Sequence, residues 1–250
     1  MIIGIIPARY SSSRLKGKPL ADIGGKPMIQ HTWESVNKSK LISEVIIATD
    51  DKRIFETAKS FGAFVVMTPK EIQTGSDRIA YVAKKTPSAE IIVNIQGDEP
   101  FIPGKMIDEA IEPLLFDKSV NVSTLAKRIT TPEELFSRSI PKVVFDYSSY
   151  ALYFSRLPIP CVRDADSDEQ RLRLGEYYKH VGLYVYRKEA LFKFTSFLPT
   201  DLEKFEKLEQ LRMLENGMKI KVVVTEFDSI SVDTQEDLDA ARNYYKEIMK

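Results

Sequence analysis

The chain has 250 residues, 43% of them hydrophobic, and its 36 basic residues are balanced by 36 acidic ones. This length and composition are enough to bury a large core, as one large domain or two small ones. Zero formal net charge argues against a general nucleic-acid or membrane-surface binder. The apolar start is too short for a signal peptide and no later stretch approaches about 18 apolar residues, so we expect a cytoplasmic protein with no membrane partner. The single cysteine, Cys161, cannot form an internal disulfide, and we expect a buried or half-buried thiol rather than a nucleophile.

The first predicted element is a buried strand over residues 2–7, a short apolar run that ends at a proline. The next helical pattern begins near Pro27, so the connection between them is far longer than an ordinary βα loop, and long loops in compact domains are commonly functional. Residues 8–18 carry four cations and no acid, namely Arg9, Arg14, Lys16 and Lys18. Open α/β sheets bind ligands at the carboxyl ends of their strands. We therefore expect this basic loop to bind the triphosphate of a nucleotide.

Standard phosphate-binding motifs are absent from the sequence. Lys18 and Lys26 each follow a glycine but precede proline, so neither forms a Walker loop, and no G-x-G-x-x-G follows a strand. The basic loop can instead surround phosphate oxygens with backbone N–H groups, hydroxyls and cations. The candidates for this role are Ala8, Arg9, Ser12, Ser13, Arg14 and Lys18. Lys16 remains open between a phosphate contact and a solvated surface charge.

Strand-like and helix-like stretches alternate through the first half of the chain. Strands are predicted over residues 45–49, 63–67 and 91–95, and helices over 54–61, from Ser76, and from Pro103 to about Phe116. This alternation predicts an α/β fold with a mostly parallel sheet. We interpret the second half of the chain as an extension of that sheet plus a segment that leaves the sheet and returns. We expect strands over residues 143–154, 184–186 and 219–224, a helix over 202–215, and a mobile charged loop or arm over 163–173.

Two aspartates are candidate ligands for the divalent metal that a bound triphosphate requires. Asp98 follows a strand and stands beside Gly97, whose missing side chain lets a ligand come close, so it is either a metal ligand or an ordinary turn carboxylate. Asp233 precedes a helical segment. Taken alone, it is either a second ligand or a complement to the helix dipole, with Thr234 as the cap.

Nine stretches, in order from Ile2 to about Leu238, carry a family resemblance. They are IIPARYSSSRLKGKPL, IATDD, TGSDR, NIQGDEP, KVVFD, YALYFSR, YKHVGLYVYR, KLEQLR and SVDTQEDL. Together they resemble the 3-deoxy-manno-octulosonate (Kdo) cytidylyltransferases, also called CMP-Kdo synthetases. The opening stretch is shared with other sugar cytidylyltransferases, whereas YALYFSR combined with LEQLR distinguishes the Kdo branch. Lys16 stands where proline is frequent, and residues 164–174 are long and charged, but neither departure affects a candidate catalytic residue.

The resemblance implies a fold and a reaction. The fold would be a three-layer αβα, Rossmann-like nucleotide-diphosphosugar transferase with a mixed, mostly parallel sheet. It would form a single domain over residues 1–250, with a dimer-forming extension roughly within 140–190. The reaction would join CTP and Kdo to give CMP-Kdo and pyrophosphate for lipopolysaccharide biosynthesis. The alternatives are a related acid sugar such as 8-amino-Kdo or a sialic acid, a glycosyltransferase that consumes nucleotide sugars, and a non-catalytic nucleotide-binding relative.

The resemblance also implies roles for individual residues. Arg9, Arg14 and Lys18 would hold the CTP phosphates, and Gly75, Ser76 and Arg78 would line the cytosine and ribose side. Gln96 and Asp98 would also bind the nucleotide, and Asp98 and Asp233 would hold Mg²⁺. The sugar acid would meet Gln96, Arg156, Arg163, His180, Tyr184, Glu209 and Gln210. Arg156 or Arg163 suits the carboxylate, because a planar guanidinium can bind both of its oxygens. His180 is either a ligand or structural, and we expect His31 to be structural.

Overall fold

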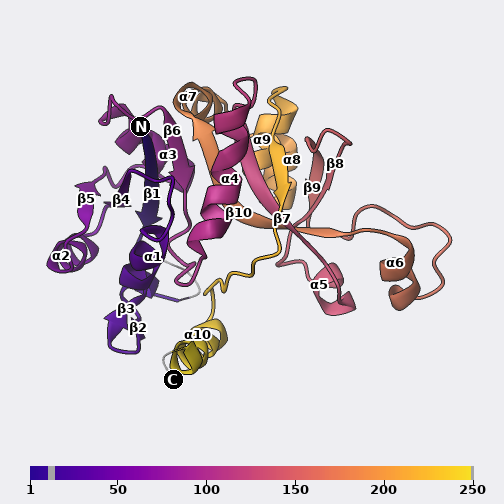
Figure 1. Cartoon of the computed structure of the whole chain (residues 1–250), viewed down its shortest axis with the longest axis horizontal. Helices are drawn as coiled ribbons and strands as arrows, with labels where there is room; N and C mark the ends of the chain where they lie inside the picture. The colour runs from indigo at the N-terminus through magenta and orange to yellow at the C-terminus, as the bar shows by residue number, and fades with distance from the viewer. Residues whose placement is uncertain (11–14, 249–250) are drawn as a thin grey trace. The chain divides into compact units, whose positions relative to one another are not determined.

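The computed structural model describes residues 1–10 and 15–248, which form two compact units. Unit 1 comprises Met1–Asp108 and Asp228–Lys250, and unit 2 comprises Glu109–Phe227. Helix α4 (Gly104–Phe116) contains the boundary between them (Figure 1). The predicted α/β class, with a mixed and mostly parallel sheet, is confirmed. A single domain with a dimerisation extension stays a prediction.

Unit 1 is built on a parallel sheet in the order β6-β1-β4-β5. Its strands are β1 (Ile2–Ala8), β4 (Glu44–Thr49), β5 (Phe64–Met67) and β6 (Ile91–Asn94). Ile5 pairs with Ile46 on one side and Asn94 on the other, and the inner strands are buried on both faces, which explains their nearly continuous apolar sequences. Because the strands are parallel, their carboxyl ends lie along one edge. Residues 9–10, 50–51 and 95–98 therefore follow neighbouring strand ends.

Helices connect these strands and cover the sheet. They are α1 (Met28–Val36), α2 (Lys52–Ser60) and α3 (Gly75–Lys84). Side-chain caps start two of them: Asp51 accepts a hydrogen bond from the Arg53 amide at α2, and Thr74 accepts one from the Asp77 amide at α3. The long first loop contains the 3-10 turn η1 (Lys18–Leu20) and the hairpin of β2 (Asp22–Ile23) and β3 (Lys26–Pro27).

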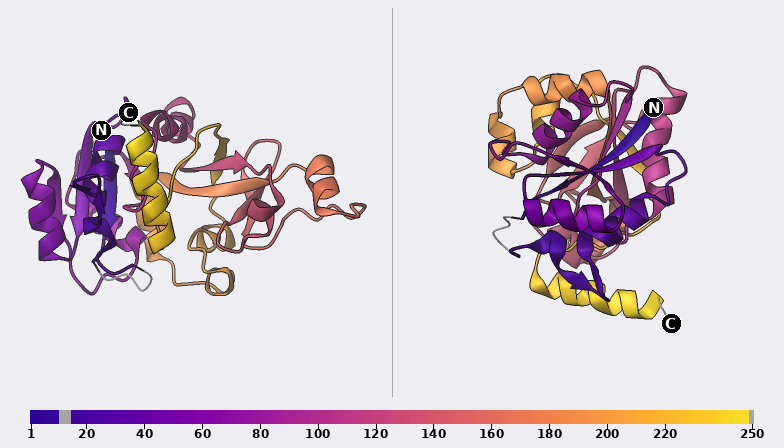
Figure 2. Two further views of the ribbon diagram at one scale, coloured as in Figure 1. Left: turned by 90° about the horizontal axis from the view of Figure 1, so that it is seen from below. Right: turned by 90° about the vertical axis from the view of Figure 1, so that its left-hand side faces the viewer.

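The C-terminal helix α10 (Gln235–Ile248) belongs to unit 1 and lies beside the β2–β3 hairpin (Figures 1 and 2). Ile23, Met28, Val232, Leu238 and Ala241 form its buried apolar contact. His31, expected to be structural, is buried here, with Nε2 2.7 Å from the Ile23 carbonyl oxygen and its ring against Phe101 and Tyr245. This packing holds the segment before α10 in place, and that segment contains Asp233.

Unit 2 has a mixed set of strands. They are β7 (Val122–Arg128), β8 (Lys142–Phe145), β9 (Ala151–Ser155), β10 (Tyr178–Arg187) and β11 (Lys221–Val224). β10 pairs antiparallel with β7 and β8, β8 pairs antiparallel with β9, and β11 runs parallel to β7. The helices are α5 (Pro132–Phe136), α6 (Asp168–Leu174), α7 (Lys188–Ser196), α8 (Asp201–Glu206) and α9 (Gln210–Glu215). We did not predict β7, α5 or α7 from the sequence.

Several predictions for unit 2 were wrong in detail. The strand expected over residues 143–154 is a hairpin, because the chain turns back at Ser149, which has φ 58°. The helix expected over 202–215 is two helices, because Lys207 is left-handed, with φ 55°, and ends α8. Part of the expected charged loop is helix α6, whose cap is Ser167. The strand expected over residues 184–186 belongs to the longer strand β10, which begins at Tyr178. The first half of β10 was not predicted because it is polar and contains no apolar run.

Two further observations concern membrane insertion and the cysteine. No helix within residues 1–10 and 15–248 combines the length and apolarity needed to cross a bilayer. Cys161 is exposed, so the expected burial of its thiol was wrong. It lies in the extended segment after β9, outside any helix or strand.

Candidate functional site

A lysine and two aspartates from distant parts of the sequence meet in unit 1. The Lys18 ammonium donates to Asp98 Oδ2 at 2.6 Å and to Asp233 Oδ1 at 3.0 Å. Burial lowers the pKa of Lys18, but the Asp98 and Asp233 carboxylates more than offset it, so the net pKa lies above the ordinary value. Lys18 is therefore a firmly charged cation shared by two carboxylates.

Local structure explains how these three side chains are placed. Lys18 opens η1 after Gly17, whose φ of 71° suits glycine. Asp98 follows β6, and its carbonyl oxygen accepts a hydrogen bond of 2.9 Å from the Val232 amide, which brings Asp233 beside it. Thr234 caps α10 as expected, by accepting from the Asp237 amide at 3.2 Å. The Asp233 carboxylate itself points to Lys18.

Gly97 is a close-approach position, but the neighbour that requires it is strand β1. A Cβ atom on Gly97 would lie 3.0 Å from the Pro7 carbonyl oxygen. The missing side chain thus lets the turn after β6 pack against the end of β1. This contact sets Asp98 close to the start of the basic loop.

Glu99 is a third carboxyl group at this edge that sequence reasoning missed. It contacts the Ser229 hydroxyl. The pKa of Glu99 is raised to about 7, mainly by burial; Asp98 and Asp233 contribute to the rise, whereas Ser229 and Lys18 oppose it. The sequence signal that could have identified Glu99 is its position directly after Asp98, in the turn that follows a strand.

Arg9 and Arg78 are organised by Asp50, which directly follows β4. The Arg9 Nη1 donates to the Gln73 carbonyl oxygen at 2.7 Å, and its Nε lies 4.0 Å from Asp50 Oδ2. Arg78 is fully buried, donates to Asp50 Oδ2 at 2.8 Å and contacts the Thr68 hydroxyl. Arg9 remains partly exposed at the edge of the sheet, whereas the Arg78 guanidinium is bound by Asp50 and Thr68.

The other predicted nucleotide-binding residues that the structure describes also lie at this edge. Ala8 ends β1, Gln96 follows β6, and Gly75 and Ser76 form the first turn of α3. An amino-terminal helix turn carries a partial positive charge and free N–H groups that suit an anion. Lys16 is exposed. Ser12, Ser13 and Arg14 lie outside the described residues.

In unit 2, His180 and Tyr184 lie together on β10. Their ring centroids are 5.3 Å apart, and His180 Nε2 lies 2.9 Å from the Thr124 hydroxyl on β7. Burial lowers the pKa of His180 to about 3, so the imidazole is neutral near pH 7. A neutral imidazole can offer a ligand a hydrogen bond but not a positive charge.

Arg156 follows β9 and is held by backbone carbonyl groups. Its Nε donates to the Glu206 carbonyl oxygen at 2.6 Å, and Nη1 donates to that of Arg138 at 2.9 Å. Arg163, by contrast, is exposed in the segment before α6. Glu209 and Gln210 lie at the start of α9, where Gln210 is buried.

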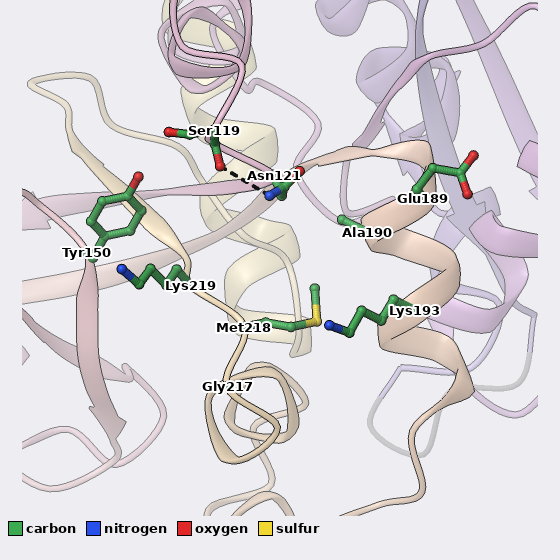
Figure 3. Close-up of a pocket in the computed structure, with 9 residues that line it drawn as sticks. All are labelled: Ser119, Asn121, Tyr150, Glu189, Ala190, Lys193, Gly217, Met218 and Lys219. Carbon is green, nitrogen blue, oxygen red and sulfur yellow. Dashed lines mark hydrogen bonds between the residues drawn. The ribbon is translucent and has the colours of Figure 1, made fainter.

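Unit 2 also contains a cavity of about 400 Å³ (Figure 3). Its lining comes from the segments before β7, β9 and β11 and from helix α7. The residues are Ser119, Asn121, Tyr150, Glu189, Ala190, Lys193, Gly217, Met218 and Lys219. None of them is among the residues predicted from the sequence.

Comparisons with known proteins agree with this architecture. A family model described as cytidylyltransferase matches residues 3–220. A 3-deoxy-manno-octulosonate cytidylyltransferase of Geotalea uraniireducens is 53% identical over 242 residues, which cover 95% of this chain and 96% of the relative.

Solved structures give the same result. That of a CMP:2-keto-3-deoxy-manno-octonic acid synthetase complexed with CTP has a TM-score of 0.92 at 37% identity, and the match covers 99% of each chain. The 4-diphosphocytidyl-2C-methyl-D-erythritol synthase of Anaerococcus prevotii shares the fold, with a TM-score of 0.61 at 18% identity and 98% of each chain covered.

Proposed function

This chain belongs to the 3-deoxy-manno-octulosonate cytidylyltransferase family, and we propose that it transfers the cytidylyl group of CTP to Kdo, with release of pyrophosphate, for lipopolysaccharide biosynthesis. The observation that carries the proposal is the cluster of Lys18, Asp98 and Asp233 at the carboxyl edge of a parallel sheet. Open α/β sheets bind their ligands at this edge. The related synthetase of known structure was solved with CTP, which supports CTP as the nucleotide.

In the proposed reaction, the anomeric hydroxyl of Kdo attacks the α-phosphorus of CTP. A new O–P bond forms, the bond to the β-phosphate breaks, and the hydroxyl proton passes to solvent. Such in-line transfer depends mainly on positioning and on neutralising charge. Lys18 and Arg9 would bind the departing pyrophosphate, with Arg14 as a further candidate. No dedicated base is required.

Asp98 and Asp233 are proposed to hold Mg²⁺. Their chemistry fits, because this carboxylate pair already binds a cation, the Lys18 ammonium. Within residues 1–10 and 15–248 no group of three or more His, Cys, Asp or Glu side chains is arranged to hold a metal. The remaining ligands would be water and phosphate oxygens, which is the usual way that proteins bind Mg²⁺. When bound, the ion would neutralise charge on the phosphate oxygens and acidify a hydroxyl placed against it.

The sugar acid is proposed to meet residues of unit 2. Arg163 is exposed and can offer a free guanidinium fork to the carboxylate, whereas Arg156 is anchored to backbone carbonyls and can offer a rigid positive charge. His180 and Tyr184 would contribute hydrogen bonds. Glu209 and Gln210 complete the proposed set in unit 2, and Gln96, a residue of unit 1, remains a further candidate.

We also propose a cytoplasmic homodimer. Leu152, Leu157 and Leu174, all within the predicted dimerisation segment, expose 62%, 55% and 56% of their surface. Contiguous exposed apolar patches mark protein interfaces, and the proposed dimer would cover these side chains. Sedimentation equilibrium should give twice the mass of one chain, and a single-chain mass would contradict the dimer.

The proposed reaction is tested by offering CTP, ATP, GTP and UTP with Kdo, 8-amino-Kdo and a sialic acid. Pyrophosphate release should require CTP and be fastest with Kdo, and mass spectrometry should identify CMP-Kdo. Faster turnover of another acid sugar would reassign the substrate. No release with any combination would support a non-catalytic relative.

A further inference from the structure

Tyr10 and Gly17, near the two ends of the basic loop, are held together beside helix α2. The Gly17 amide donates to the Tyr10 carbonyl oxygen at 3.0 Å. A Cβ atom on Gly17 would lie 3.1 Å from carbon atoms of the Tyr10 ring, so the glycine backbone lies directly against that ring. Arg9 stands immediately before this contact and Lys18 immediately after it. Whatever holds Tyr10 therefore also sets the spacing of these two cations.

Tyr10 is held by an arginine that is itself held by a carboxylate. The central guanidinium carbon of Arg53 lies 3.2 Å from the centroid of the Tyr10 ring. Asp51 binds the same guanidinium through two hydrogen bonds, of 3.0 Å to Nε and 2.7 Å to Nη2. Asp51 is also the cap of α2, so the pair is fixed to a helix terminus. In addition, α2 contacts η1, which begins with Lys18.

A role in overall stability does not account for this arrangement. The Arg53 side chain is 57% exposed, and exposed ion pairs contribute little to stability. A guanidinium over an aromatic face is attracted to the ring, however, and its two bonds to Asp51 fix its orientation. The arrangement thus restrains Tyr10 more than it stabilises the fold.

We propose that the Asp51–Arg53 pair is a positioning element for the nucleotide triphosphate. Through Tyr10 and Gly17 it fixes the base of the basic loop, and with it the separation of Arg9 and Lys18. Asp51 and Arg53 would act through Tyr10, without a contact of their own to the substrate. The inference rests on the proposed function, since it concerns how the chain binds CTP.

The test compares Arg53→Ala and Arg53→Lys with a matched control, Lys59→Ala. Lys59 lies on the same helix with its ammonium 5.1 Å from the Phe55 ring centroid, so the control removes a similar cation–ring contact away from the loop. Arg53→Ala should raise the KM for CTP and the calorimetric Kd for CTP about two- to fivefold, the scale of one exposed cation–ring contact. The KM for the acid sugar and the thermal midpoint should stay at wild-type values. Arg53→Lys should be intermediate, because an ammonium keeps the charge but loses the paired bonds to Asp51.

Three results would overturn the proposal. The first is unchanged CTP affinity in Arg53→Ala, and the second is an equal loss in Lys59→Ala. A fall in the thermal midpoint with no selective effect on CTP would also assign Arg53 to the fold alone. Failure of the proposed function is distinguishable, because it appears as absent turnover in the unmodified protein. Calorimetry with whichever nucleoside triphosphate binds would still test Arg53 in that case.

Discussion

The pKa of His180 can be measured, and its value tests whether this side chain of unit 2 is neutral in the folded protein. Burial holds the folded-state pKa at about 3, against an ordinary value of 6.5. The unfolded chain therefore takes up a proton at pH values where the folded protein does not. Because proton uptake favours the unfolded chain, the stabilising contribution of the neutral His180 is full above about pH 6.5. It is lost as the pH falls toward the folded-state pKa. Acidification should thus destabilise the protein through His180.

Proton linkage sets the size of the effect. Between about pH 7.5 and pH 5, the unfolded imidazole becomes largely protonated while the folded one stays neutral, which corresponds to a loss of roughly 2 kcal/mol. His180→Gln removes the titration while keeping a group that can hydrogen-bond to Thr124. The variant should lose about 2 kcal/mol less than the unmodified chain over this range. Carboxylates titrate in both proteins, so they cancel in the comparison.

Two measurements check this reasoning. Urea unfolding followed by circular dichroism at both pH values gives the free energies. Proton NMR gives the pKa directly, because the chain has only two histidines and the variant identifies the His180 signal. A His180 signal that titrates near pH 6.5, or equal pH dependence of both proteins, would refute the neutral imidazole. It would also reopen a cationic role for His180 toward the sugar carboxylate.

Three further predictions concern catalysis. Asp98→Asn should lower kcat at least about 10²-fold, the scale of one lost electrostatic contact in a transition state, while Asp239→Asn, an exposed aspartate on α10, should not. Near-normal turnover of Asp98→Asn at saturating Mg²⁺ would contradict the metal assignment. Lys18→Ala should impair the use of CTP more than of Kdo when each is varied separately, and an effect confined to the KM for Kdo would reject a phosphate role. Arg156→Lys should raise the KM for Kdo and Arg163→Ala should mainly lower kcat; the reverse pattern, or no change, would place the carboxylate elsewhere.

Much of unit 1 could be predicted because its signals are local. Strands buried on both faces appear in the sequence as short apolar runs, and residues that closely follow them, such as Arg9 and Asp98, must then lie along one edge of a parallel sheet. A cap such as Thr234 depends on residues within one helical turn. These features need no knowledge of what packs against them.

Contacts between distant segments could not be read in this way. Whether Asp233 faces the site or only a helix terminus depends on the hydrogen bond between the Val232 amide and the Asp98 carbonyl group. The same holds for Arg78, a cation that proved to be buried on Asp50, and for Arg156, which binds backbone carbonyls of another segment. An arginine has the same sequence signature whether its partner is a ligand or the protein. Only the packed chain determines which partner lies within hydrogen-bonding distance, because that choice depends on segments that the fold brings together.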